Sequence, residues 1–273
     1  MLGQAVVVEA RRHDHEVFAL SPAELNVCDG PAVAESLAAL APDVVVNCAA
    51  WTDVDGAEAD EPAALECNGV APGLLAESAN AVGARLIHIS TDYVFDGSST
   101  RPYVESDPTG PRSAYGRTKL AGERAVQAAG GPHAIARTAW LFGTGGRNFV
   151  ATMLSLAADG REAVSVVSDQ VGCPTFAGHL AIALVEIAER RLAGVMHVAG
   201  AGHCSWAELA AEAFSQSGSA CKVIPIGTEE FPRAAQRPAR SILESERPDT
   251  PRLPSWQAGV SAYLAEATQW IAR

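Results

Sequence analysis

The first half of the chain alternates between short apolar runs and longer stretches in which apolar residues recur with helical periodicity. The short runs are apolar nearly throughout, which is typical of parallel strands that helices cover on both faces. The predicted strands are residues 16–20, 43–48, 85–90 and 133–140. The predicted helices are residues 5–12, 32–40, 63–81 and 114–129. This order predicts an α/β fold, a Rossmann-like doubly wound parallel sheet.

The alternation loosens in the second half of the chain. The pattern predicts helices at 148–158 and 179–190 and strands at 163–167 and 195–198. Ser205 is expected to cap a further helix, with Glu208 completing a capping box. A segment rich in proline and arginine follows at 231–252 and is expected to form a loop that faces the substrate. We predict a dinucleotide-binding domain at residues 1–142 and a smaller, mainly substrate-binding region at 143–273, partly interleaved with the first.

Composition excludes several classes of function. The formal net charge is −12 and only two residues are lysine, which argues against a nucleic-acid surface. No apolar run is long enough to span a membrane and no signal peptide is visible, so we expect a cytoplasmic protein. The six cysteines include no C-x-x-C pair, and the histidines add no ligand spacing. We therefore expect reduced thiols and no metal site.

Tyr115 and Lys119 carry the clearest chemical signal. Residues four apart on a helix share a face, so the phenol and the ammonium can point into one cleft. A nearby cation is expected to lower the pKa of the tyrosine, which would then give a proton to a keto oxygen while a hydride reaches the carbon. The alternative is a surface tyrosine above a solvated lysine, because Y-x-x-x-K alone is a weak motif.

Thr91 and Asp92 follow a predicted strand within the segment STDYVFDG (residues 90–97). Ligands of open α/β sheets bind at the carboxyl ends of the strands, where a hydroxyl can hold a keto oxygen in the path of the hydride. The alternative is that these short polar side chains only close a turn.

Several motifs in the same order resemble the dTDP-4-dehydrorhamnose reductases, a family of extended short-chain dehydrogenase/reductases. They are STDYVFDG, Y-x-x-x-K, NCAAWTDVDGAE (residues 47–58) and DQVGCPT (residues 169–175). The resemblance runs over nearly the whole chain. It implies NAD(P)H-dependent reduction of dTDP-4-dehydro-L-rhamnose to dTDP-L-rhamnose, with a dTDP-4-keto-6-deoxysugar as substrate.

The resemblance also implies roles for individual residues. The catalytic residues would be Thr91, Tyr115 and Lys119, and the last two would also contact the cofactor. Further cofactor contacts would be Gly3, Asn26, Val27, Ala50, Trp51 and Thr52. The substrate would lie against Thr91, Asp92, Trp140 and Arg237. Trp140 has packing as its alternative role, and Arg237 is expected at the diphosphate because a guanidinium forks onto phosphate oxygens. The family's metal-binding glutamate is missing after Thr175, so no metal is expected and the oligomeric state, monomer or homodimer, stays open.

The beginning of the chain departs from the family pattern. A dinucleotide fold starts with a buried strand and a glycine-rich turn, whereas this sequence opens at Met1 and passes directly into a helical pattern. Gly3 fits the last glycine of that turn. We expect either a natural start about a dozen residues upstream, where the missing strand and turn would lie, or weak cofactor binding. The strand end at residues 19–22 has no acid for a ribose hydroxyl, which favours NADPH, with NADH possible.

Two other functions remain open at the level of sequence. A reductase of another dTDP-4-keto-6-deoxysugar would use the same catalytic residues. A non-catalytic regulatory or binding subunit on the same fold is the alternative from a different class, because fold alone does not define function.

Overall fold

A central sheet of four parallel strands organises the computed structural model, which describes residues 1–271. The strands lie in the order β1, β2, β3, β8, and their bounds are Val44–Asn47, Arg85–Thr91, His133–Thr138 and Gly194–His197. In this register Asn47 pairs with His88, and Thr91 pairs with Thr138. Because all four strands are parallel, their carboxyl ends meet at one edge of the sheet.

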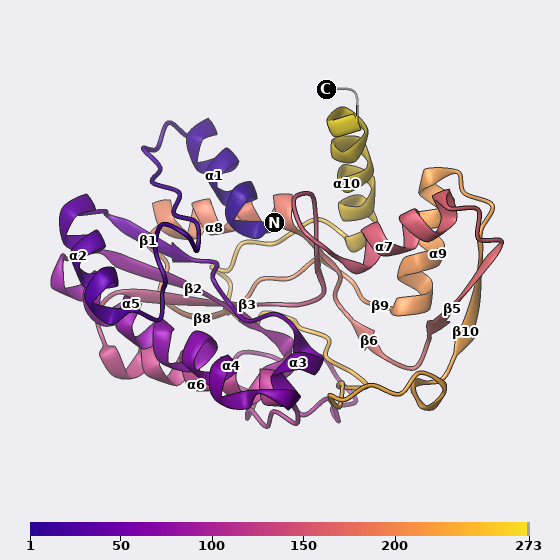
Figure 1. Ribbon diagram of the computed structural model, residues 1–273, viewed down its shortest axis with the longest axis horizontal. Coiled ribbons are helices and arrows are strands. Elements are labelled where there is room, and N and C mark those ends of the chain that lie inside the picture. The colour runs from indigo at the N-terminus through magenta and orange to yellow at the C-terminus, as the bar shows by residue number, and fades with distance from the viewer. Residues whose placement is uncertain (272–273) are drawn as a thin grey trace.

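Helices cover both faces of this sheet (Figure 1). One face packs against α2 (Gly30–Leu40), α5 (Ala71–Ala81) and α6 (Ala114–Ala129), the other against α1 (Leu2–Arg12) and α8 (Ala177–Glu189). Successive residues of a strand point to opposite faces of the sheet. Leu86 packs in the hydrophobic core beneath α2 and α5, and Ile87 packs in the core beneath α1 and α8. The predicted doubly wound α/β fold is therefore confirmed.

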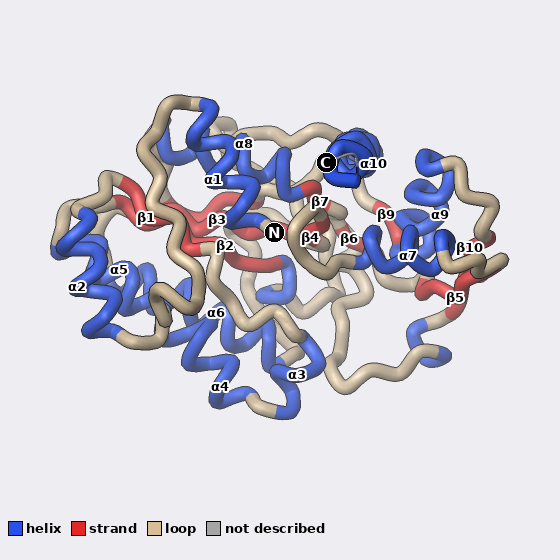
Figure 2. The backbone as a smooth tube through the Cα atoms, turned by 45° about the horizontal axis from the view of Figure 1, so that its top comes forward, coloured by secondary structure: helices blue, strands red, loops and turns tan. Residues whose placement is uncertain are grey.

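A smaller unit lies beside the sheet (Figures 1 and 2). Its two-stranded parallel sheet pairs β5 (Ala163–Val167) with β10 (Lys222–Ile226) and packs against α7 (Phe149–Ala158) and α9 (Trp206–Ser217). Two short pairs connect the units, and a last helix follows. The first pair is β4 (Leu141–Phe142) with β7 (Thr175–Phe176), and the second is β6 (Val171–Gly172) with β9 (Cys204–Ser205). The last helix is α10 (Trp256–Ile271). The domain division at residue 142 stays a prediction. The predicted interleaving of the two units is supported by α8 and β8, which follow β5 in the chain but pack with the four-stranded sheet.

Most predicted elements are confirmed, and α6 and β5 have the predicted bounds. Ser205 caps α9 through the expected capping box with Glu208. The strand at residues 16–20 is wrong: these residues form a loop, in which Phe18 and Leu20 are 51% and 45% exposed. A strand needs a neighbouring strand for its ladder hydrogen bonds. Residues 16–20 have no such neighbour in the described part of the chain, where β1 is an edge strand that pairs only with β2.

The helix predicted at 63–81 is confirmed, but it begins two residues earlier and a π-helical turn interrupts it. The segment is α4 (Glu61–Leu65), a π-helical turn η1 (Glu66–Val70) and then α5. Before it, Asp53 caps the short helix α3 (Val54–Ala59), which the pattern did not reveal. Two 3₁₀ turns complete the structure, η2 (Asp92–Val94) and η3 (Thr228–Glu230). No helix within residues 1–271 is long and apolar enough to cross a membrane.

Candidate active site

Lys119 lies on the face of α6 that packs against the sheet. Ser113 caps this helix by accepting a hydrogen bond from the Gly116 amide at 3.1 Å. Lys119 is only 2% exposed, and its Nζ donates to the carbonyl oxygen of Ile89 in β2 at 2.6 Å. The alternative of a solvated surface lysine is therefore excluded. An ammonium has three donors, so the others remain available for a ligand at this edge of the sheet.

Thr91 ends β2 and is buried together with Asp92. Its hydroxyl donates to Asp92 Oδ1 at 3.0 Å and accepts from the Tyr93 amide at 3.2 Å, so it does close the 3₁₀ turn η2. The same hydroxyl also interacts with the side chain of Tyr115. Closing the turn and contacting the phenol are thus compatible. Burial raises the pKa of Asp92 to about 6, although hydrogen bonding with Ser241 and Thr91 acts to lower it.

Tyr115 carries a correction to the expected electrostatics. Burial raises the pKa of its phenol to about 12; hydrogen bonding with Thr91 acts in the opposite direction, and the charge of Asp92 adds to the increase. The expectation that Lys119 lowers this pKa is wrong here, because the ammonium is directed to the Ile89 carbonyl. At neutral pH the phenol therefore keeps its proton, as a proton donor must.

Lys119 is surrounded by groups that act in opposite directions on its charge. Burial lowers the pKa of its ammonium to about 8, while Glu123 and, more weakly, the thiols of Cys67 and Cys48 raise it. Desolvation disfavours the charged form of a lysine, and a nearby carboxylate favours it. With a pKa of about 8 the ammonium is mostly charged at neutral pH and loses its proton in mild alkali.

The segment after β1 contains three of the residues expected at the cofactor, Ala50, Trp51 and Thr52. It is held by Asn68, a residue that the sequence reasoning missed. The Asn68 amide accepts from the Trp51 amide at 2.9 Å and donates to the Trp51 carbonyl at 3.0 Å and to Thr118 Oγ1 of α6 at 3.2 Å. A π-turn commonly marks a functional site, and a buried asparagine within a helical pattern was the available signal.

Gly3, Asn26 and Val27 lie on two further segments. A Cβ at Gly3 would be 3.6 Å from Cys48 Cβ, so the first turn of α1 adjoins the end of β1. Val27 packs against the core beside α2, while Asn26 is exposed and accepts from the Cys28 amide. The first turn of α1 contains no acidic residue, and free amides at a helix N-terminus suit a pyrophosphate. These features, with Lys119, fit a nicotinamide dinucleotide along the sheet edge.

Trp140 and Arg237 have protein partners in this structure. The Trp140 ring stacks on Trp206 with centroids 3.5 Å apart, and a Cβ at Gly172 would come within 2.5 Å of that ring, so only glycine fits there. Packing is therefore one role of Trp140, and substrate contact stays a prediction. Arg237 forms a two-pronged ion pair with Asp55 of α3, at 3.1 and 2.7 Å. Its expected contact with a diphosphate also stays a prediction.

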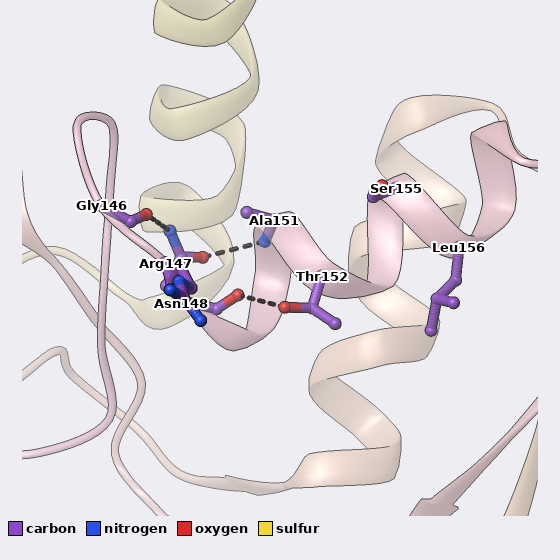
Figure 3. Close-up of a pocket in the computed structure, with 7 residues that line it drawn as sticks. All are labelled: Gly146, Arg147, Asn148, Ala151, Thr152, Ser155 and Leu156. Carbon is purple, nitrogen blue, oxygen red and sulfur yellow. Dashed lines mark hydrogen bonds between the residues drawn. The ribbon is translucent and has the colours of Figure 1, made fainter. Parts of the chain in front are cut away.

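A surface hollow of about 400 Å³ lies elsewhere, beside the first turns of α7 (Figure 3). It is lined by residues of the segment from Gly146 to Leu156 and contains none of the expected site residues. The assignment of the chemistry to the sheet edge stays a prediction. Among residues 1–271, no group of three or more histidines, cysteines or acids could hold a metal ion.

Comparisons with known proteins point to one family. The family model described as the RmlD substrate binding domain matches residues 1–269. The dTDP-4-dehydrorhamnose reductase of Sinorhizobium fredii is 41% identical over 90% of this chain and 88% of its own. A probable dTDP-4,6-dihydroxy-2-methyloxan-3-one 4-ketoreductase of Streptomyces antibioticus is 44% identical over 90% of this chain and 84% of its own.

A solved structure agrees with these sequence relatives. The crystal structure of dTDP-4-dehydrorhamnose reductase from Bacillus anthracis in complex with NADP superposes with a TM-score of 0.94. It is 34% identical in sequence, and the match covers 97% of this chain and 95% of the other.

Proposed function

This chain belongs to the RmlD substrate binding domain family, and on that premise we propose that it is an NADPH-dependent dTDP-4-dehydrorhamnose reductase. It reduces the 4-keto group of dTDP-4-dehydro-L-rhamnose and forms dTDP-L-rhamnose. NADPH is favoured over NADH by the NADP complex of the Bacillus anthracis relative and by the lack of an acid at residues 19–22. One observation carries the proposal: Tyr115 of α6 interacts with Thr91 at the end of β2, and Lys119, on the same helix face, donates to Ile89 two residues before Thr91.

The residues divide the chemistry between them. When bound, the nicotinamide supplies a hydride to the keto carbon. Tyr115 gives its proton to the keto oxygen, and its pKa of about 12 keeps that proton in place until the oxygen becomes basic. The Thr91 hydroxyl, which donates to Asp92 in the free protein, would turn to donate to the same oxygen. Lys119 has two ammonium donors beyond the one used by the Ile89 carbonyl, and these would hold the cofactor. The segment at Trp51, held by Asn68, positions the cofactor.

Burial of the site favours this reaction over proton exchange with water. Thr91 is 6% exposed and Asp92 1% exposed, so the oxygen would meet few competing solvent donors. Trp140 and Arg237 lie on the segments that follow β3 and η3, where the deoxysugar and the diphosphate of the substrate would fit. The cytoplasmic location stays a prediction, which the six unpaired cysteines of the structure support.

A second substrate has a specific observation in its favour. The Streptomyces antibioticus relative is named for a different dTDP-ketosugar, yet its identity to this chain is as high as that of the dehydrorhamnose reductases. The deciding experiment is turnover of NADPH with a panel of dTDP-4-keto-6-deoxysugars, followed by product identification. We expect dTDP-4-dehydro-L-rhamnose to have the highest kcat/KM. A higher value for another ketosugar would move the assignment to that substrate, and no turnover of any would favour a non-catalytic binding subunit.

A further inference from the structure

Glu123 extends the functional face of α6 by one more turn. Tyr115, Lys119 and Glu123 are spaced four residues apart, so they lie along one stripe of the helix. Glu123 is as deeply buried as Lys119, with 2% of its surface exposed. An acid at this depth is rare unless it is paired, and the reaction described above makes no use of it.

The Glu123 carboxylate joins α6 to the two central strands. Ser90 of β2 donates its hydroxyl to Oε1, and Arg137 of β3 donates Nε to Oε1 at 2.9 Å and Nη2 to Oε2 at 2.7 Å. Ser90 immediately precedes Thr91, and Arg137 pairs with Ser90 across the sheet. A short charge-assisted connection of this kind fixes the distance between a helix and a strand. Here it fixes α6 relative to the strand that carries Thr91.

Arg137 is itself held in place from two sides. Its guanidinium carbon lies 5.1 Å from the centroid of the Phe95 ring, and Nη1 is 3.4 Å from His197 Nε2. His197 Nδ1 faces the carbonyl oxygens of Tyr103 and Glu244, so Nδ1 carries the proton and Nε2 accepts from Arg137. Burial lowers the pKa of His197, in keeping with this neutral form. Both oxygens of the Glu123 carboxylate thus accept hydrogen bonds, and Arg137 has partners on both of its sides.

The charge of Glu123 also reaches Lys119. The titratable and charged groups around this ammonium are Cys48 after β1, Cys67 in η1, His88 in β2, Arg137 in β3 and Glu123 in α6. Burial lowers the pKa of His88 and raises that of Cys48 to about 11, so both are uncharged at neutral pH. Among the groups that raise the pKa of Lys119, Glu123 has the largest effect.

We propose that Glu123 is a positioning residue for the reduction: with Ser90 and Arg137 it sets the place of α6 against β2, and on the same helix face it provides the carboxylate one turn from Lys119. This inference rests on the proposed reductase function only for its expected effects on kcat and on the pH–rate profile. The contact of Glu123 with both strands and its effect on Lys119 do not depend on the identity of the substrate.

The test compares Glu123→Gln with Glu61→Gln in the full chain. Glu61 also holds α6 through a two-pronged ion pair, to Arg117 at 2.8 and 2.6 Å, but that pair is half exposed and lies on the outer side of the helix. We expect Glu123→Gln to lower kcat and to move the alkaline limb of the pH–rate profile down by about one pH unit, as loss of a neighbouring opposite charge does. Glu61→Gln should leave that limb in place.

A second readout needs no turnover. The chain has only two lysines, so protein labelled with ¹³C,¹⁵N-lysine gives two side-chain signals, and Lys222 serves as the internal reference. Glu123→Gln should lower the titration midpoint of Lys119 from its value near 8, while Glu61→Gln should not. An unchanged Lys119 midpoint in folded Glu123→Gln would overturn the inference. A wild-type protein that fails to reduce any ketosugar would overturn the proposed function instead, and the lysine titration would still decide this inference.

Glu123→Gln leaves the Arg137 charge buried without a partner, which can prevent folding. The double variant Glu123→Gln/Arg137→Met removes both charges and is measured in that case. The double variant also lacks the Glu123 carboxylate, the group that raises the pKa of Lys119 most, so it should show a lowered midpoint as well. A folded double variant with the wild-type midpoint and alkaline limb would overturn the inference equally.

Discussion

Burial decides how the two functional groups of α6 titrate. The same loss of water contact raises the pKa of the Tyr115 phenol to about 12 and lowers that of the Lys119 ammonium to about 8. Desolvation disfavours charge in either group, so at neutral pH the phenol stays protonated and the lysine is held near its titration point. Two side chains on one helix face thereby differ in charge: the Tyr115 phenol is neutral and can donate a proton, and the Lys119 ammonium is mostly charged.

Replacing Tyr115 by phenylalanine removes the proton donor and keeps the ring. We expect kcat to fall by roughly 10²- to 10⁴-fold, the usual contribution of a general acid. NADPH binding, followed by fluorescence titration, should change little. The matched control is Tyr93→Phe, because the two rings are in edge contact 5.5 Å apart and only one hydroxyl belongs to the proposed site. A Tyr115→Phe enzyme with the wild-type rate would show that another group supplies the proton.

Replacing Lys119 by methionine should stabilise the fold while removing activity. A folded-state pKa of about 8 against an ordinary 10.5 means that the unfolded chain holds the proton more tightly. The penalty is present in full below pH 8 and fades as pH rises toward 10.5; the difference corresponds to roughly 3 kcal/mol. Urea unfolding at neutral pH should therefore show Lys119→Met to be more stable than wild type by up to that amount.

Lys222→Met is the control for this experiment, because Lys222 is the other lysine of the chain and lies exposed on β10. It should give no comparable gain. The advantage of Lys119→Met should also shrink in alkali, as wild type sheds its buried charge. A Lys119→Met protein less stable than wild type at neutral pH would contradict the account of a costly buried ammonium.

At the scale of elements, the π-turn η1 connects α6 to the segment after β1 that contains Ala50, Trp51 and Thr52, here called the cofactor segment. A Cβ at Gly122 of α6 would lie 2.1 Å from the Asn68 carbonyl oxygen, so the two helical segments pack at backbone distance. From that position the Asn68 side chain reaches both Trp51 and Thr118. A π-turn changes the direction in which a helical side chain points, and here it accompanies the contacts of Asn68 with Trp51 and Thr118.

Asn68→Ala should weaken NADPH binding more than it slows turnover. It removes three hydrogen bonds and leaves the backbone groups of Trp51 unsatisfied, which costs about 1–3 kcal/mol of stability. Asn80→Ala is the control, because Asn80 donates to the carbonyls of Ala129 and Gly130 at the far end of α6. It should lower the melting temperature without changing the NADPH Kd. An unchanged Kd in Asn68→Ala would rule out the positioning of the cofactor segment by this residue.

Periodicity was sufficient to predict elements whose own residues determine them. The bounds of α6 and β5 and the capping box of α9 follow from local pattern and from Ser205 with Glu208. Residues 16–20 have the composition of a strand, but strand formation depends on a neighbour that no local pattern contains. The π-turn was hidden for a similar reason, since it depends on tertiary hydrogen bonds of Asn68 and not on propensity.

The positions of the candidate site residues were predictable where motifs fix both spacing and face. Tyr115 and Lys119 share a helix face and Thr91 ends a strand, as the sequence indicated. Their electrostatics were not predictable, because the pKa of Tyr115 depends on burial beneath other segments. The partners of Trp140 and Arg237 come from distant parts of the chain, Trp206 and Asp55, and no spacing rule reveals such pairs.

At the scale of the whole molecule, the parallel sheet brings the candidate site residues to one edge. The end of β1, the end of β2 and the buried face of α6 meet there, and the smaller unit with α7 and α9 stands beside it (Figure 1). In open α/β sheets with helices on both faces, ligands bind in the crevice outside the carboxyl ends of the strands. This geometry accounts for a site built from segments far apart in sequence.

Transfer of deuterium from labelled NADPH tests the central claim most directly. The enzyme would be incubated with dTDP-4-dehydro-L-rhamnose and NADPH carrying deuterium at the reactive position of the nicotinamide, and the product analysed by NMR and mass spectrometry. The account predicts dTDP-L-rhamnose with one deuterium on carbon 4 of the sugar, formed with equal consumption of NADPH, and none with Tyr115→Phe on the same time scale. Unlabelled product, deuterium at another carbon or no reduced sugar would contradict it.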